Sequence, residues 1–341
     1  MGGGARILLE ITAGPSGNPF IDAWAIWDAG WYLSIAENGY SADATARGQA
    51  SYAFFPLYPW LITSVGMYIQ NNVIAGLLIS NVAFIAACVA LYRWILIDHE
   101  EKLAQTVLVT FILFPGSFIF TAVMSEGLFG IATLMSLYLA RKERFALAAL
   151  CALAAVLTRS MGVFIGVALA YEIYRKHKTL FTTQILWLLL LPLGWVIVGL
   201  INHNLTGDPF AWIQIQKEAW QHLTTFPLAV IWEGFFTPEE PAFAFNALYT
   251  CIVGLFIIAS FKLVRLGDYA LALIFFFVPL CSGIVTLYSM VRYSVVAFPL
   301  YVFIGYWIYR KPILKAPALA IGIFLQLLFM VLWTTGSYYI I

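Results

Sequence analysis

An acidic residue surrounded by aromatic side chains stands near the start of the chain, and these are the residue types of a sugar-handling site. Residues 27–40 read WDAGWYLSIAENGY. The aromatic residues that flank Asp28 in this stretch are Trp27, Trp31, Tyr32 and Tyr40. Aromatic rings stack on the apolar C–H faces of sugars, and a carboxylate can take the proton of an attacking hydroxyl. The alternative is an aromatic belt at a membrane interface with a solvated aspartate.

Two arginines lie between apolar runs and could hold an anionic group at the membrane boundary. Arg159 stands in LTRSMG and Arg292 stands in SMVRYS. A guanidinium grips phosphate through two hydrogen bonds and stays charged when it is partly buried. Charges at membrane depth are functional candidates, although an arginine near a helix end also extends to lipid head groups. We expect both arginines on the face that carries Asp28, where they would bind a phosphate.

Two further polar residues are candidates that also have simpler explanations. Glu126 follows Ser125 where a helix is expected to begin, and the positive end of a helix dipole favours an acid there. His203 begins the stretch HNLTGDPFAW and could act as a base or a hydrogen-bond donor, although a lone histidine is more often structural. We treat both as candidate substrate contacts, together with Tyr58 and Tyr293.

Composition places the chain in a membrane. Of its 341 residues, 62% are hydrophobic and only 10% are charged, whereas soluble domains carry about 25% charged residues. Apolar runs long enough to cross a bilayer recur along most of the chain. The net charge is +1, which gives no indication of nucleic-acid binding. We read residues 1–341 as a single integral membrane domain.

About ten membrane-spanning helices are expected, which predicts an all-α polytopic fold. Their expected ranges are 73–97, 103–122, 126–140, 145–157, 161–174, 183–201, 246–264, 269–287, 293–309 and 316–339. The fourth and fifth are shorter than the usual ~20 residues. They would form a tilted hairpin or lie where the bilayer thins.

The distribution of Lys and Arg predicts the orientation. Basic residues cluster in 141–144, 175–178, 262–265 and 310–315, which can all lie on the cytoplasmic side. Two long segments, 18–72 and 202–245, then form outer loops on the opposite, non-cytoplasmic face. That face is where we expect the site.

The apolar stretch 55–69 inside the first outer loop is not expected to span. Pro56 and Pro59 lie within it, and proline removes a backbone donor and disfavours a continuous helix. We therefore read it as an interfacial or re-entrant segment that closes the loop.

The remaining motifs narrow the chemistry. The four cysteines lie in apolar runs without paired spacing, so neither disulfides nor thiolate metal sites are expected. No cluster of His, Cys and Asp has metal-ligand spacing, so the sequence requires no metal or other cofactor. A divalent ion held by an Asp/Glu pair would be adventitious. The absence of a P-loop and of GxGxxG disfavours a reaction driven by ATP or a nucleotide sugar.

Six motifs occur in an order that resembles a known family. They are WDAGWYLSIAENGY (27–40), AFFPLYP (53–59), FPGSFIFTAVMSEGLF (114–129), TRSMG (158–162), TGDPFAW (206–212) with Gln216 and Trp220, and RYSVVAFPLY (292–301). Together they resemble the PIG-V type of mannosyltransferase, the family of GPI mannosyltransferase II and its prokaryotic relatives. This family belongs to the GT-C glycosyltransferases.

The resemblance implies a GT-C-type helix bundle with its active site on the non-cytoplasmic face. It also implies a polyprenyl-phosphate-linked hexose donor, with mannose favoured, and inverting transfer to a hydroxyl of a lipid, glycolipid or other acceptor. The membrane would be the plasma membrane in a prokaryote or the endoplasmic reticulum in a eukaryote. In such enzymes an acid in the first outer loop is the catalytic base, a position that Asp28 matches. One departure is that the family has a spanning helix before the first motif, whereas the 26 residues here contain no spanning apolar run.

On this interpretation Asp28 accepts the proton of the acceptor hydroxyl, and Arg159 and Arg292 stabilise the departing phosphate. Glu126 would orient the substrate or an arginine. The residues expected to shape the sugar pocket are Trp27, Trp31, Tyr32, Tyr40 and Tyr58.

Two other functions stay open from the sequence. A transporter or flippase of a lipid-linked sugar would use the same charged residues as a translocation path, although no internal repeat is found. A structural subunit of a larger complex is the third possibility, and two long loops dense in Trp, Tyr and acid count against it.

Overall fold

The computed structural model describes residues 16–45, 48–219, 224–337 and 339–340. Within these ranges the chain is built from helices and turns without a strand, so the prediction of an all-α protein is confirmed. The longer helices are α3 (Ala29–Asn38), α4 (Leu57–Ile69), α5 (Asn72–Ile95), α6 (Glu101–Leu113), α7 (Glu126–Arg141), α8 (Phe145–Thr158), α9 (Ile165–His177), α10 (Leu190–Thr206), α11 (Ala211–Ala219), α12 (Pro227–Phe235), α13 (Pro241–Ala259), α14 (Leu266–Leu280), α16 (Pro299–Arg310) and α17 (Lys315–Thr334).

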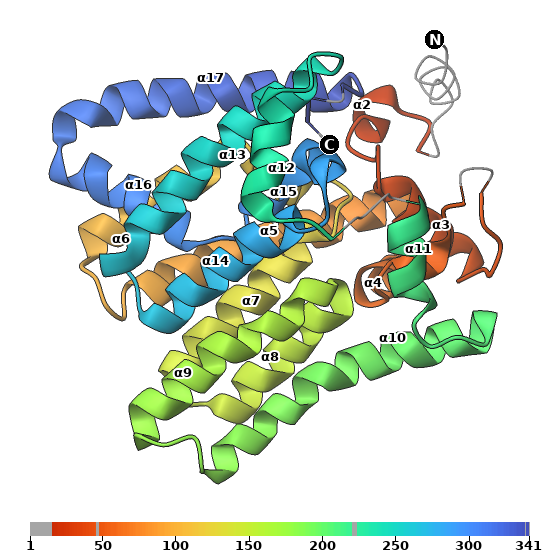
Figure 1. Ribbon diagram of the computed structural model, residues 1–341, viewed down its shortest axis with the longest axis horizontal. Helices are drawn as coiled ribbons and strands as arrows, with labels where there is room; N and C mark the ends of the chain where they lie inside the picture. Colours follow the sequence, from red (N-terminus) through yellow and green to blue (C-terminus); the bar gives the residue numbers. More distant parts are fainter. Residues whose placement is uncertain (1–15, 46–47, 220–223, 338, 341) are drawn as a thin grey trace.

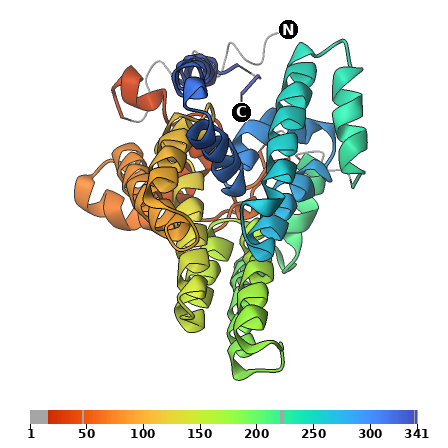
Figure 2. The same cartoon turned by 90° about the vertical axis from the view of Figure 1, so that its left-hand side faces the viewer.

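Helix α7 occupies the centre of the bundle. It packs along α5 on one side and α8 on the other, and α9 also contacts it. Helices α8, α9 and α10 extend below the rest of the molecule, whereas α17 crosses the top (Figures 1 and 2). The two ends of α7, Glu126 and Arg141, therefore lie at opposite ends of the centre of the bundle.

Among the described residues, four helical segments are long and apolar enough to cross a membrane alone. They are Asn72–Ile95, Thr183–Thr206, Pro241–Lys262 and Pro312–Thr334. A bent pair, Ile284–Ser294 with Pro299–Arg310, would make a fifth. The expectation of about ten spans is not confirmed, because several of the expected ranges form shorter or interrupted helices.

The span expected over 103–122 is wrong in its second half. Helix α6 ends at Leu113, and a 3-10 turn, η3 (Ser117–Thr121), follows. Phe114 precedes Pro115 and has an extended backbone (φ −66°, ψ 139°). The residue before a proline avoids the helical region for steric reasons, and this ends the helix.

The span expected over 293–309 is also interrupted. A short helix, α15 (Met290–Ser294), is separated from α16, which begins at Pro299. The two halves of the bent pair meet at 58°. Proline lacks the N–H of an interior helical residue but fits the first position of a new helix. The break leaves Arg292 on a short helix inside the molecule.

The stretch with Pro56 and Pro59 forms the 13-residue helix α4. Pro56 precedes the first helical residue and Pro59 lies in the first turn, where N–H groups have no partner within the helix. Thirteen residues span only about 20 Å, less than bilayer hydrocarbon. The helix is thus shorter than a span, and its interfacial position stays a prediction.

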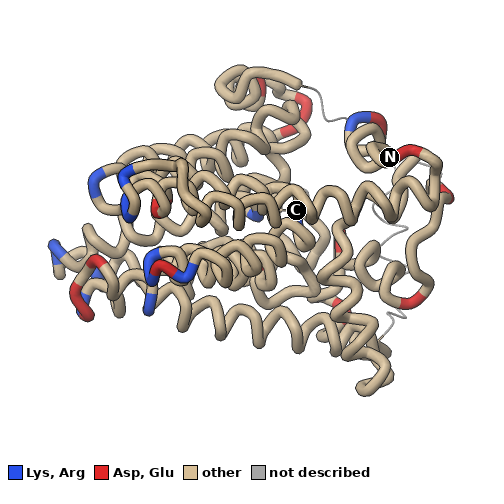
Figure 3. Tube along the Cα trace, turned by 90° about the horizontal axis from the view of Figure 1, so that it is seen from below, with Lys and Arg blue, Asp and Glu red and all other residues tan. Residues whose placement is uncertain are grey.

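The two segments expected as outer loops contain helices. The first holds α3 and α4, and the second, 202–245, begins inside α10 and continues through α11 and α12. Both lie away from the end at which most Lys and Arg residues gather (Figure 3). The basic segments that the sequence assigns to one side therefore share one end of the bundle.

A small apolar cluster fixes the first of these segments. Ala29 of α3 and Tyr58 and Ile62 of α4 are buried together with Trp333 of α17. Each fully buried large apolar side chain removes enough surface from water to stabilise the fold by about 1.5–3 kcal/mol. This packing holds α3, and with it Asp28, against the central helices.

Candidate active site

Asp28 lies at the N-terminal end of α3. It occupies the N-cap position, but its side chain makes no capping hydrogen bond. The preceding residue, Trp27, has a left-handed backbone with φ 60°. A bulky residue rarely adopts this conformation, and such strain tends to occur at functional sites. The carboxylate of Asp28 is thus free of the helix end and lines a cavity.

The carboxylate of Asp28 is paired with Arg292. Nη1 of Arg292, on α15, donates a hydrogen bond to Oδ2 of Asp28 at 2.5 Å. The arginine side chain is 6% exposed and the aspartate side chain is 26% exposed. The two residues are 264 positions apart in the chain, and the fold therefore brings together two residues that the sequence analysis singled out separately.

Glu126 connects the two arginines. Its Oε1 is ion-paired with Nη1 of Arg159 and lies 3.3 Å from Nε of Arg292. Glu126 is 1% exposed, and a carboxylate this deeply buried requires compensating positive charge. Its other oxygen, Oε2, has no hydrogen-bond partner among the described residues. Two carboxylates and two guanidinium groups thus form one chain from Asp28 to Arg159.

Two glycines, Gly127 and Gly162, allow the close backbone contacts that position Glu126 and Arg159. A Cβ on Gly127 would come within 2.9 Å of the carbonyl oxygen of Phe120, so only glycine allows this close approach beside Glu126. A Cβ on Gly162 would meet the backbone nitrogen of Val156 at 2.4 Å. The TRSMG turn therefore folds tightly over the end of α8 and presents Arg159 to the site. The side chain of Arg159 is 19% exposed, more than that of Arg292.

Tyr293 lies beside both guanidinium groups. The centre of its ring is 5.4 Å from Cζ of Arg159 and 5.3 Å from Cζ of Arg292. Cations within about 6 Å of an aromatic ring are attracted to its face. Tyr293 therefore braces the arginines and also lines the cavity.

Ser125 and Tyr32 complete the polar network. The hydroxyl of Tyr32 donates to Oγ of Ser125 at 2.9 Å, and Nη1 of Arg159 donates to the same oxygen at 3.3 Å. Burial is the largest influence on the Tyr32 phenol and raises its pKa, against the opposing charge of Arg159. Tyr32 therefore keeps its proton and acts as a donor.

The network borders a cavity of about 820 Å³. One part of the wall is apolar and includes Phe129, Phe275, Val278 and Val296. Another part is polar and includes Gln49, Gln216 and Lys217. A cavity of this size, with apolar walls and a few convergent polar groups, is typical of a ligand site.

Most of the aromatic residues expected in the sugar pocket lie behind the cavity wall. Tyr32 lines the cavity, but the other four are not among its lining residues. Trp27 packs edge-on against Trp333, and Trp31 stacks on Phe54. The hydroxyl of Tyr40 donates to the carbonyl of Phe54, and Tyr58 is fully buried with its hydroxyl near Ser80. In this state of the protein they support the site, and their contact with sugar stays a prediction.

His203 lies outside the cavity. It stands in the last turn of α10, and its Nδ1 is 3.0 Å from the carbonyl oxygen of Gly207, the residue that follows the helix. Trp220, part of one family-like motif, lies outside the described residues. Among the residues that the structure describes, no group of three His, Cys, Asp or Glu side chains could hold a metal ion.

Two polar residues of the site, Ser125 and Lys217, are not singled out as site residues from the sequence. Ser125 stands there only as the residue before Glu126, and its place between Tyr32 and Arg159 depends on the packing of separate helices. In the polar wall formed by α11, Gln216 belongs to one of the family-like motifs, whereas Lys217 on a short helix reads as part of a solvated face.

The comparison with known families agrees with the resemblance in the motifs. A family model described as mannosyltransferase (PIG-V) matches residues 17–217, which is more than half of the chain. The match contains Asp28, Glu126 and Arg159, whereas Arg292 lies beyond it. No curated protein matches the chain.

Proposed function

Because the chain belongs to the PIG-V mannosyltransferase family, we propose that its cavity transfers a hexose, with mannose favoured, from a polyprenyl-phosphate carrier to an acceptor hydroxyl. The family and the apolar helices make the protein an integral membrane glycosyltransferase. The observation that carries the proposal is the cavity itself. It joins one partly exposed carboxylate, Asp28, to two guanidinium groups. These are the groups that such a transfer needs.

The proposed reaction is a single displacement at the sugar. The acceptor oxygen forms a bond to C1 of the hexose while the bond from C1 to the phosphate oxygen breaks. The acceptor proton passes to Asp28, and the electron pair of the broken bond leaves with the polyprenyl phosphate. Because the nucleophile attacks from the side opposite the leaving group, the anomeric configuration inverts. The leaving group is a stable anion, so it requires charge stabilisation rather than an acid.

The arginines supply that stabilisation. Arg159 is the more exposed of the two, and its Nη1 donates to both Glu126 and Ser125. A guanidinium held at one corner in this way can direct its other N–H groups to phosphate oxygens. Arg292 lies beside it across Tyr293. The acceptor, a lipid or glycolipid, would reach Asp28 from the open part of the cavity.

The proposal is tested by supplying the donor directly. Full-length protein in liposomes is incubated with radiolabelled mannosyl phosphoryl polyprenol and a membrane lipid extract, and in parallel with labelled GDP-mannose. We expect label in a new glycolipid only with the polyprenyl donor. Label that crosses the bilayer without forming a new glycoside would contradict the proposal and indicate a flippase. Product formed from GDP-mannose alone would contradict the donor assignment.

We also propose that the cavity opens to the non-cytoplasmic side. The support is the gathering of Lys and Arg at the other end of the bundle (Figure 3). Ser41 and Glu239 are exposed in the two outer segments, and Lys311 is exposed at the basic end. In a background without native cysteines, Ser41→Cys and Glu239→Cys should react with an impermeant thiol reagent in intact cells. Lys311→Cys should react only after permeabilisation, and labelling of only one outer position would refute this topology.

A further inference from the structure

The proposed base is not free in this structure. Oδ2 of Asp28 accepts a hydrogen bond from Arg292 at 2.5 Å, and the pair is partly shielded from water. A carboxylate that takes up a proton loses its attraction to a paired guanidinium. The pairing therefore opposes the proton transfer that the proposed function assigns to Asp28.

The cluster of four charged residues has no excess positive charge for a phosphate, and the further cation among the cavity-lining residues is Lys217 of α11. Asp28 and Glu126 together balance Arg159 and Arg292. A phosphate that enters this cluster must compete with carboxylates for the guanidinium groups. Glu126 is 1% exposed and is held from two sides, whereas Asp28 is 26% exposed and lies at a helix end without a capping bond. Asp28 is therefore the carboxylate that a phosphate displaces more easily.

Arg292 is placed to exchange one partner for another. Nη1 reaches Asp28, while Nε lies 3.3 Å from Oε1 of Glu126 without hydrogen-bond geometry. Nε can stay beside Glu126 while the far end of the guanidinium turns. The ring centre of Tyr293 lies 5.3 Å from Cζ of Arg292, and its cation–π attraction would persist as the guanidinium turns over the ring.

We propose that the donor phosphate takes Arg292 from Asp28 and thereby frees the carboxylate to act as the base. Without a donor, Arg292 pairs with Asp28. With a donor, Arg292 and Arg159 hold the phosphate, and Asp28 turns to the acceptor hydroxyl. Proton acceptance is then tied to occupancy of the donor site, so the donor binds before the acceptor can react. This inference rests on the proposed function of the cavity.

Exchange of Arg292 between Asp28 and phosphate predicts an effect on donor binding that is not expected if Asp28 acts only as a base. If Asp28 competes with phosphate for Arg292, then Asp28→Asn should bind the donor more tightly while losing transfer. The probe is farnesyl phosphate, a short polyprenyl monophosphate, titrated by calorimetry into the detergent-solubilised full chain. We expect roughly fivefold tighter binding, as for removal of one partly exposed ion pair. Unchanged or weaker binding in a variant with wild-type thermal stability would overturn the exchange.

A double-mutant cycle separates the exchange from general repulsion. Removal of any nearby negative charge favours phosphate binding, with or without Arg292. The exchange instead requires that the gain from Asp28→Asn disappears in the Arg292→Gln background. A gain that persists there would overturn the proposal. Asp43→Asn removes an acid of the same outer segment that does not line the cavity, and it should leave binding within twofold of wild type.

The transfer assay keeps the two proposals apart. Lost transfer with tighter probe binding supports both the base and the exchange. Lost transfer with unchanged binding retains the base and rejects the exchange. Retained transfer in Asp28→Asn rejects Asp28 as the base, whatever the binding result.

Discussion

The bundle carries two clusters of buried charge, one at each end of α7. Glu126, the first residue of α7, belongs to the cluster with Asp28, Arg159 and Arg292. Arg141, its last residue, belongs to the other. The sixteen residues of the helix separate them by roughly 22 Å. The two clusters have similar chemistry, and they differ in what surrounds them.

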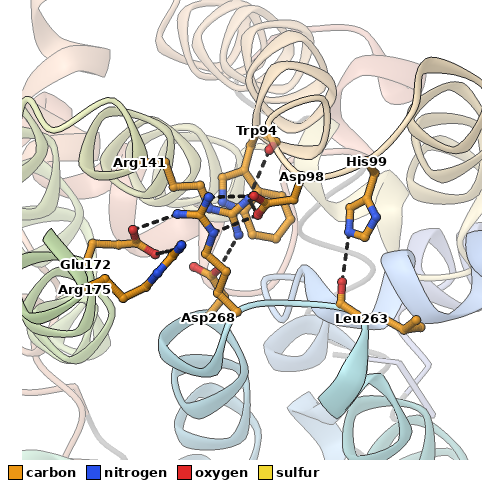
Figure 4. Close-up of polar contacts among 9 residues, drawn as sticks. Trp94, Asp98, His99, Arg141, Glu172, Arg175, Leu263 and Asp268 are labelled. Carbon is orange, nitrogen blue, oxygen red and sulfur yellow. Dashed lines mark hydrogen bonds and ion pairs between the residues drawn. The ribbon is translucent and has the colours of Figure 1, made fainter.

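The second cluster ties the ends of four helices together (Figure 4). Arg141 pairs with Asp268 and, at 2.7 Å, with Asp98. Arg265 bonds both oxygens of Asp98, at 2.6 and 2.8 Å, and reaches Glu172 at 2.7 Å. The guanidinium of Arg141 also lies 4.2 Å from the ring centre of Trp94. None of these residues lines the cavity described above.

This comparison shows that buried charge alone does not identify a site. Arg141 and Asp268 are 2% and 3% exposed, as buried as Arg292, and Nε of Arg141 also has no hydrogen-bond partner within the described part of the chain. The difference is the cavity and not exposure. Asp28 and Arg159 are 26% and 19% exposed and line the cavity. Asp98 and Arg265 are 27% and 17% exposed, and neither lines it. We therefore assign chemistry to the first cluster and stability to the second.

The largest contrast should appear in activity. Asp28→Asn keeps the shape of the side chain and removes the proton acceptor. We expect transfer from mannosyl phosphoryl polyprenol to fall by about 10²–10⁴-fold, the range of general base catalysis. Asp98→Asn, the matched change in the second cluster, should leave the rate per folded molecule unchanged. Equal losses in the two variants would remove the distinction between the clusters.

The converse contrast should appear in stability. Arg141→Met leaves Asp268 buried without its partner and should destabilise the protein by about 3–5 kcal/mol. Arg175→Met is the control, because Arg175 is 43% exposed and its ion pair with Glu172 is long, at 3.5 Å. This substitution should lower the free energy of unfolding by less than about 1 kcal/mol. Thermal unfolding in detergent measures both. An Arg141→Met protein as stable as wild type would show that the second cluster does not stabilise the fold.

A smaller effect is expected from a conservative change in the cavity. Arg292→Lys keeps the charge and loses the planar fork. We expect donor use to weaken by about tenfold, the loss of one charge-assisted hydrogen bond. Arg310→Lys, at the basic end, should have no effect. If Arg292→Lys retains full donor use, Arg159 alone would remain as the phosphate ligand.

The smallest effect concerns acid stability of the second cluster. Burial opposes ionisation of Asp98, but the hydrogen bond from Arg265 and the charges of Arg141 and Arg265 outweigh it and lower the pKa below its ordinary value of 3.8. A lowered pKa in the folded state stabilises the fold above the ordinary value, and this contribution is lost as pH falls through the folded pKa. Melting temperatures of wild type should therefore drop on acidification below about pH 4. Asp98→Asn should lack this part of the drop, and parallel curves would contradict the assignment.

All four charged residues of the first cluster are predicted from the sequence, but of their pairings only that of Glu126 with an arginine is anticipated, as one of two roles. Asp28, Glu126, Arg159 and Arg292 stand out because charged residues beside apolar runs are rare. Their ion pairs depend on how α3, α7, α8 and α15 pack, which no local pattern encodes. The break that creates α15 could have been read from Pro299, yet the apolar run around it suggested one continuous span.

From the sequence, the basic residues of the second cluster predict only the orientation of the chain in the membrane. Arg141, Arg175 and Arg265 were counted as basic loop residues that set orientation. That reading uses only charge and position along the chain. Burial of Arg141 between Asp98 and Asp268 depends on contacts across 43 and 127 residues, so the structure was needed to distinguish a solvated charge from one that stabilises the fold.

The central claim is that the donor phosphate binds in the cavity of the first cluster. Photo-crosslinking tests it most directly, with a polyprenyl phosphate that carries a diazirine on the isoprene next to the phosphate. After irradiation and digestion of the full-length protein, we expect label on peptides from 158–164 and 275–296, suppressed by excess unlabelled polyprenyl phosphate. Competable label at the basic end instead, on peptides around Asp98 or Arg265, would contradict the account.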